Sequence, residues 1–143
     1  MGSYESFPGQ VEDDGSPARA LNVAGQAVRD ANHRSNGRLE AGRPGWQFPA
    51  DVGQALGELS CLAGGLPQAF EQIIRALRGQ LDQGGIKIDA GTEWEDDPAG
   101  AVEAASVGLE HASQGAHQMH RGITDAQGAI NRAAYAGPDS DED

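Results

Sequence analysis

A regular alternation of apolar residues at spacings of three and four, between residues 102 and 133, constrains the fold of this chain more than any other feature. Such spacing places the apolar side chains on one side of an α-helix. The members of the series are Val102, Ala105, Leu109, Ala112, Ala116, Met119, Ile123, Ala126, Ile130 and Ala133. Pro98 suits the first turn of this helix, and Asp97 or a neighbour can cap it. We therefore predict a long amphipathic helix.

An earlier segment carries a second series with the same spacing. Its members are Val52, Leu56, Leu59, Ala63, Leu66, Phe70, Ile73 and Leu77. Gly64, Gly65 and Pro67 interrupt it, and proline removes a helical hydrogen-bond donor. We expect a kink near Pro67, or two helices in nearly continuous register, rather than a reversal of the chain. Gly84 and Gly85 are expected to end this arm.

The two series predict an all-α fold in which residues 50–135 form an antiparallel two-arm helical hairpin. Arms of about 33 and 37 residues would be roughly 50 and 55 Å long, so they match well enough to pair. Trp94 lies in the connector within an acidic run. It is either a lid over the end of the apolar seam or an exposed docking residue, and the lid is favoured because aromatic side chains usually bury most of their area.

The remaining segments are polar. Residues 1–15 lack apolar periodicity and are predicted to be disordered. Ser16 and Pro17 can start a short, weak helix that reaches about Asn32. The N-terminal extension, residues 1–49, is therefore expected to be disordered or weakly helical, and residues 136–143 to form an acidic tail.

Glycines recur every seventh residue of the second arm, at Gly108, Gly115 and Gly122. A glycine inside a helix costs about 1 kcal/mol relative to alanine, so this repeat indicates close approach by another helix. The alternative is that glycine is simply abundant, at 21 of 143 residues. The predicted partner interface consists of Gly108, Gly115, Gly122, Leu109, Met119 and Ile123.

The chain has a formal net charge of -12, and most of the acidic excess follows residue 50. Such a surface repels phosphate and anionic lipid, so binding to nucleic acid or to a membrane surface is not expected. No apolar run approaches the length of a membrane span. The first residues lack the pattern of a secretory signal peptide. A cytoplasmic location, or export without such a signal, is expected.

Candidate catalytic and metal-binding residues are few. His117 and His120, with Glu110 one heptad before His117, are a conceivable but incomplete metal pair. Cys61 is the single cysteine and has no local signature of a nucleophile, so a buried small hydrophobic residue is the default interpretation. Phosphate-binding and hydrolase motifs are absent. We expect no catalytic residues, no metal, no cofactor and no small-molecule substrate.

Three features together resemble a known family. These are the predicted hairpin, Trp94 in its turn, and Tyr135 and Asp139 directly after the second arm. They resemble the WXG100/ESAT-6-like and PE-like helical-hairpin substrates of type VII secretion. The resemblance implies that Tyr135 and Asp139 form a YxxxD export signal, and that the hairpins pair as homodimers or heterodimers into four-helix bundles.

The sequence leaves two functions open. The first is a non-enzymatic interaction or assembly protein that buries its small-residue helical face against a copy of itself or a partner protein. The alternative is a secreted substrate of a type VII-like system. Both predict a protein partner or a homo-oligomer.

Overall fold

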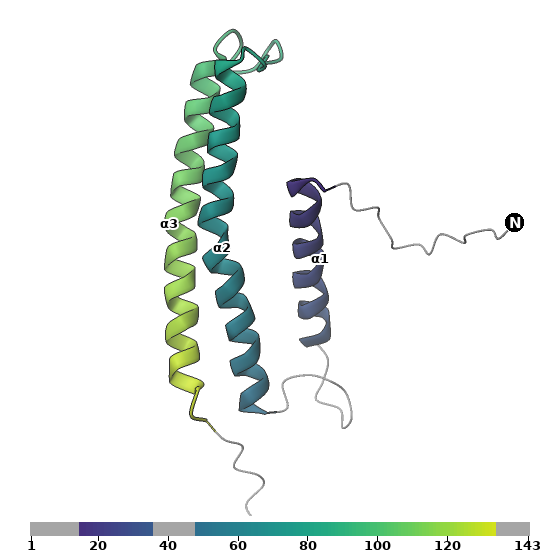
Figure 1. The fold of residues 1–143 in the computed structure, drawn as a ribbon, viewed down its shortest axis with the longest axis vertical. Helices are drawn as coiled ribbons and strands as arrows, with labels where there is room; N and C mark the ends of the chain where they lie inside the picture. Colours follow the sequence, from purple (N-terminus) through teal and green to yellow (C-terminus); the bar gives the residue numbers. More distant parts are fainter. Residues whose placement is uncertain (1–14, 36–47, 134–143) are drawn as a thin grey trace, which may run out of the picture. The chain divides into compact units, whose positions relative to one another are not determined.

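The computed structural model describes residues 15–35 and 48–133, and these form three helices (Figure 1). They are α1 (Pro17–Ser35), α2 (Pro49–Asp82) and α3 (Pro98–Ile130). The described ranges contain no strand, which confirms the all-α prediction. The chain divides into two units, residues 1–47 with α1 and residues 48–143 with α2 and α3. The predicted disorder of residues 1–14 and the predicted acidic tail, residues 136–143, lie outside the described residues.

Helix α1 begins where the sequence predicts. The Ser16 hydroxyl accepts a hydrogen bond from the backbone N–H of Arg19 at 3.1 Å, which is the geometry of an N-cap. Pro17 occupies the first turn, where its missing N–H costs nothing. The helix continues beyond the predicted end at Asn32 as far as Ser35.

Helix α2 is a single helix that runs through Gly64, Gly65 and Pro67. A proline inside a helix costs about 3 kcal/mol, so packing of α2 against α3 must offset this loss. At its start, the backbone N–H of Phe48 donates to the Asp51 carboxylate at 3.0 Å. At its end, Gly84 has a φ of +69°, which favours glycine. The predicted stop at Gly84 and Gly85 is therefore confirmed.

Helix α3 is capped by Asp97, whose carboxylate accepts a hydrogen bond from the Gly100 N–H at 2.9 Å. Pro98 follows as the first helical residue. Both features match the predicted start. The helix ends at Ile130 and not at Ala133, which lies in a turn and is exposed.

Helices α2 and α3 lie side by side and run in opposite directions (Figure 1). Near the start of α2, Gly57 lies opposite Gln127. Further along α2, Ser60 contacts His120. Residue numbers along α2 therefore rise as those of their neighbours on α3 fall.

The contact between the two helices buries few side chains completely. In the described part of the chain, only Ala63, Val102, Ser106 and Ala116 are buried. Three of these four have one-carbon side chains or a single hydroxyl, so the helix axes approach closely at these points. Two helices share only one line of contact, and most side chains on each therefore keep part of their surface in water.

Some of the predicted pairing positions are exposed, namely Leu59 and Ile73 on α2 and Ala105, Ala112, Met119 and Ala126 on α3. On α2, the predicted column Leu56, Ala63, Phe70 and Leu77 does face α3. The second inward column is Ser60, Pro67, Ile74 and Leu81, one residue later than the predicted Leu59, Leu66 and Ile73. On α3, Val102, Leu109, Ala116, Ile123 and Ile130 face α2 as predicted, but Ser106, Ser113, His120 and Gln127 replace Ala105, Ala112, Met119 and Ala126.

The polar inward column of α3 is tolerated because its buried side-chain groups have hydrogen-bond partners. The Ser106 hydroxyl donates to the Val102 carbonyl oxygen at 2.8 Å. No buried side-chain nitrogen or oxygen in the described ranges lacks a partner. A satisfied serine costs little when it leaves water. The sequence prediction used apolar residues alone, so it could not identify these polar positions as facing α2.

We predict that Ala63→Leu destabilises the helix pair by about 1–3 kcal/mol, because extra carbons cannot fit where the exposed fraction is 1%. Ala104→Leu, on the exposed side of α3, is the control and should change stability by less than about 0.5 kcal/mol. Urea unfolding followed by circular dichroism measures both. Equal stability of the two variants would contradict the packing described for Ala63.

Candidate protein-interaction surface

The residues considered as candidates for chemistry do not converge. His117 is exposed on a groove, whereas His120 points towards α2. Within residues 15–35 and 48–133, no three His, Cys, Asp or Glu side chains are placed to hold a metal ion. Cys61 is exposed, so the expectation that it is buried is wrong. Cys61 belongs to neither of the two columns of α2 that face α3, so its side chain is on the side of α2 away from α3.

The imidazole of His120 forms a polar contact across the helix pair. Its Nδ1 atom lies 3.0 Å from the backbone oxygen of Ser60 and 3.3 Å from the Ser60 hydroxyl oxygen. The ring lies beside Gly64, where an added Cβ would be in ordinary van der Waals contact with it at 3.5 Å. A backbone oxygen accepts, so Nδ1 carries the proton. This contact joins a side chain of α3 to the backbone of α2.

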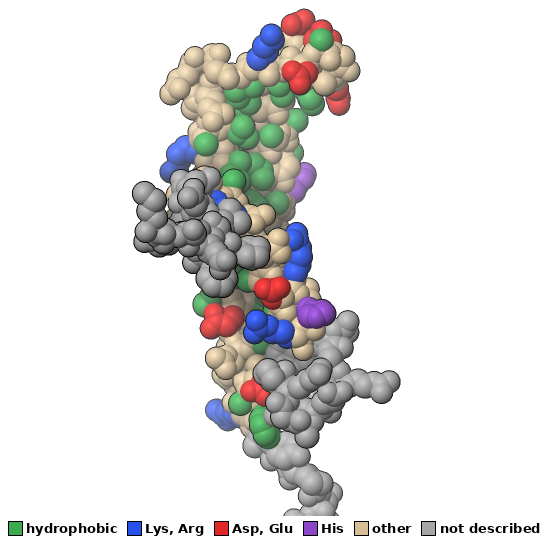
Figure 2. Space-filling model, turned by 90° about the vertical axis from the view of Figure 1, so that its right-hand side faces the viewer, with side chains coloured by type: hydrophobic (Ala, Val, Ile, Leu, Met, Phe, Trp, Pro, Cys, Tyr) green, Lys and Arg blue, Asp and Glu red, His purple; other side chains and the backbone are tan. Residues whose placement is uncertain are grey.

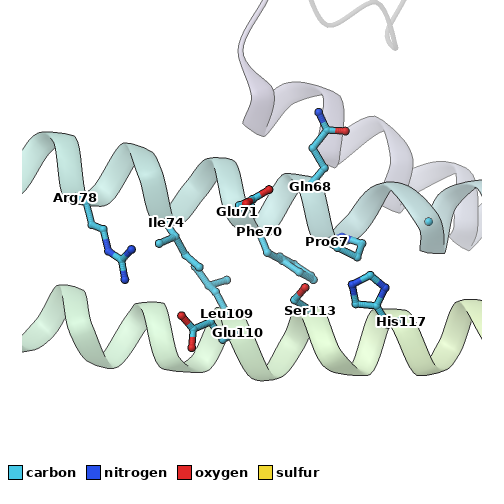
Figure 3. Close-up of a pocket in the computed structure, with 11 residues that line it drawn as sticks. Pro67, Gln68, Phe70, Glu71, Ile74, Arg78, Leu109, Glu110, Ser113 and His117 are labelled. Atoms are coloured by element: carbon cyan, nitrogen blue, oxygen red, sulfur yellow. The ribbon is translucent and has the colours of Figure 1, made fainter.

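One face of the helix pair contains a groove of about 610 Å³ (Figure 3). Phe70 and Ile74 of α2 and Leu109 of α3 point between the helices and form its apolar part. The charged or polar residues Glu71, Arg78, Glu110, Ser113 and His117 also line the groove. The groove is partly open to solvent, so water reaches these groups.

The groove also shows which sides of the two helices share a face. On α2, the groove residues Gly64, Glu71 and Arg78 each come one position after a residue of the inward column Ala63, Phe70 and Leu77. On α3, the groove residues Glu110 and His117 each come one position after the inward residues Leu109 and Ala116. Equivalent sides of two antiparallel helices therefore lie on the same face. The opposite sides must share the opposite face.

That opposite face is uncharged along both helices. On α2 it consists of Val52, Ala55, Leu59, Leu62, Leu66, Ala69, Ile73 and Ala76. On α3 it consists of Ala101, Ala105, Gly108, Ala112, Gly115, Met119, Gly122, Ala126 and Ala129. None of these residues is buried. None of them is charged, although charged residues make up 22% of the whole chain. We call this set the uncharged face.

On the uncharged face, α2 carries several leucine and isoleucine side chains, whereas α3 carries alanine and glycine except at Met119. Leu59 and Ile73 are 43% and 39% exposed, and Leu62 is similarly exposed. On α3, a Cβ added at Gly108, Gly115 or Gly122 would meet nothing within 4 Å. A ridge of leucine and isoleucine on one helix therefore lies beside a shallow trough on the other. Figure 2 shows hydrophobic side chains gathered on the part of the pair next to the connecting loop.

The structure divides the predicted partner interface into two groups. Gly108, Gly115, Gly122 and Met119 lie on the uncharged face, where Met119 is 45% exposed. Leu109 and Ile123 belong to the inward column of α3 and face α2 of the same chain. The two leucines and the isoleucine of the ridge were missed as surface residues. The signal that could have found them is the absence of charge at these positions and at their neighbours one turn away.

Trp94 lies in the loop between α2 and α3 and is half-buried. A Cβ added at Gly100 would lie 3.0 Å from its ring, so the ring covers the first turn of α3. The role of Trp94 as a lid over the end of the apolar seam stays a prediction. Tyr135 and Asp139, the possible export signal, lie outside the described residues.

Comparison with known proteins gives no family assignment. No family model, no curated protein and no solved structure matches the chain.

We predict that His120→Ala destabilises the helix pair by about 1–2 kcal/mol, because it removes the contact with Ser60 and opens a void beside Gly64. His111→Ala is the matched control on the exposed surface of α3 and should cost less than about 0.5 kcal/mol. Thermal and urea unfolding report both values. If the two variants have the same stability, the contact across the pair contributes nothing.

Proposed function

We propose that residues 50–135 form a two-arm antiparallel hairpin that acts as a non-enzymatic protein-interaction or assembly module. The observation that carries this proposal is the uncharged face, which spans both helices in a strongly acidic chain. Contiguous exposed apolar surface of this extent commonly marks a protein-binding site. The partner would be a copy of the chain or another helical protein.

The energetics of the helix pair support association. Full burial of a leucine or isoleucine side chain stabilises by about 1.5–3 kcal/mol relative to exposure. Leu59, Leu62 and Ile73 each keep more than a third of their surface in water. A partner that covers them supplies burial that the contact between α2 and α3 does not provide.

The chemistry of the surface narrows the kind of partner. The acidic groups of the chain disfavour nucleic acid and anionic lipid. None of the three described helices combines the length and the hydropathy needed to cross a bilayer. A partner helix with its own apolar stripe matches the uncharged face best, because helix-in-groove binding uses such stripes.

Site-specific photo-cross-linking tests this function. We expect a photoreactive phenylalanine at Met119, on the uncharged face, to give protein adducts in cells that produce the chain at its native level. The same group at Arg75, an exposed position of α2 outside the uncharged face and the groove, should give few or none. The mass of each adduct distinguishes a second copy from another protein. Equal adduct yields at the two positions, or none at Met119, would refute the proposal.

A second candidate function is a substrate of a type VII-like secretion system. The half-buried Trp94 in the loop between two long helices, followed by Tyr135 and Asp139 after the second helix, favours it. The loop reads Trp94-Glu95-Asp96, so it lacks the glycine of the Trp-x-Gly element. In this case the chain would leave the cell without a cleaved signal.

If the second function holds, Tyr135→Ala should abolish export from a host with an active system, because the YxxxD element loses its aromatic residue. Asp141→Ala, in the acidic tail but outside that element, is the matched control and should be exported normally. Immunoblots of culture medium and cell fractions, with circular dichroism of the purified variants, give the answer. Retention of the unmodified chain inside the cells would end this alternative.

A further inference from the structure

The two halves of α2 face α3 with different side chains. We call residues 49–63 the open-end segment, because they lie farthest from the connecting loop, and residues 68–82 the loop-end segment. The side chains that face α3 are Leu56, Ser60 and Ala63 in the open-end segment, and Phe70, Ile74, Leu77 and Leu81 in the loop-end segment. The loop-end segment therefore offers several large apolar side chains to α3, whereas the open-end segment offers Leu56 and two small residues.

Complete burial follows the same division. Among the described residues 48–62 of the open end, and 117–133 of the chain that runs beside it, none is buried. Val102 and Ser106 are buried, and they lie nearer the connecting loop than Leu109, which shares the groove with Ile74. Buried apolar surface therefore holds the loop-end segment more firmly than the open-end segment.

The open-end segment is joined to α3 by a hydrogen bond that water can replace. The His120 Nδ1 donates to the backbone oxygen of Ser60 at 3.0 Å. Both groups bind water when the helices separate, so the net contribution of such a bond to stability is modest. This contact can close the segment onto α3 without making its opening costly.

The boundary between the two segments is the weakest part of α2 as a helix. Gly64 and Gly65 have low helix propensity, and Pro67 has no N–H to donate to the backbone oxygen of Ala63. A Cβ added at Gly65 would meet nothing within 4 Å, so close packing does not require a glycine there. A break at residues 64–67 therefore costs less than a break elsewhere in α2.

We propose that the open-end segment is a separate folding unit, which detaches from α3 at residues 64–67 while the loop-end segment stays paired. Isolated helices of about 12–15 residues are at best marginally stable in water, so the detached segment also loses its helical hydrogen bonds. Such cooperative local opening is common in native proteins. The inference goes beyond the proposed function and does not depend on it.

The position of the boundary gives this opening a consequence for binding. The uncharged face crosses it, with Leu59 and Leu62 on the open-end segment and Ile73 on the loop-end segment. A partner that covers both parts binds the closed state alone, so binding and closure favour each other. This consequence rests on the proposed function. The open-end segment would then act as a switch that a partner holds closed.

Hydrogen exchange of the purified full chain, followed by mass spectrometry, tests the separate opening. We expect the amides of residues 53–63 to be at least roughly tenfold less protected than those of residues 70–80. Up to about 1 M urea, exchange of residues 53–63 should change little, because detachment of one segment exposes little surface, whereas exchange of residues 70–80 should accelerate. Equal protection and an equal response to urea in the two ranges would contradict the inference.

Gly65→Ala and its matched control Gly108→Ala locate the boundary. Both replace a glycine inside a helix where an added Cβ meets nothing within 4 Å. Gly65→Ala strengthens the helix at the boundary and should slow exchange of residues 53–63 roughly fivefold. Gly108→Ala strengthens a part of α3 that stays folded when the segment opens, so it should slow residues 70–80 and leave residues 53–63 unchanged.

These measurements need no partner, so their failure would leave the proposed function untouched. Circular dichroism confirms that both variants keep the helical content of the unmodified chain. Equal slowing of residues 53–63 by the two variants would mean that the helix pair opens only as a whole, and it would overturn the inference. An unchanged exchange rate of residues 53–63 in Gly65→Ala would do the same.

Discussion

Two helices that pack only against each other share a single line of contact, and this limit determines the rest of the molecule. In the described ranges only four residues are buried, Ala63, Val102, Ser106 and Ala116. Larger apolar side chains on α2 necessarily extend beyond that line. Because the chain places no charge among them, we propose that their surface contacts a protein partner. The small core and the interaction surface are thus two results of one constraint.

The inward column of α3 shows how the chain uses polar side chains within that narrow contact. Ser106 satisfies its hydroxyl through its own helix, and His120 reaches the backbone of the other helix at Ser60. Both arrangements avoid the cost of an unpaired buried polar group. They also leave the adjacent columns, with Leu59 and Met119 as members, available to an external partner.

Periodicity predicted the helices, their caps and one of the two inward columns of each helix. Asp97, Pro98, Ser16 and Gly84 are local signals with local causes, so the sequence was sufficient for them. The second column could not be assigned because Leu59 and Ser60 are neighbours, and the choice between them depends on how α3 approaches. Hydrophobicity favoured Leu59, whereas the close approach of the helices favoured Ser60. The glycines of the candidate surface were predicted, but the leucine ridge beside them became visible only when the inward columns were known.

The spacing of the contacts between α2 and α3 has a further consequence for alignment. Gly57 and Gly64 are one heptad apart, and so are the Gln127 and His120 side chains that lie against them. A slip of α3 by one heptad, about 10.5 Å, would therefore still bring one long polar side chain opposite one glycine. The connecting loop prevents such a slip, since internal hydrogen bonds from Gly91 to Glu95 and from Thr92 to Asp89 keep it short. The loop, more than the contact itself, selects one alignment from several that the helices would accept.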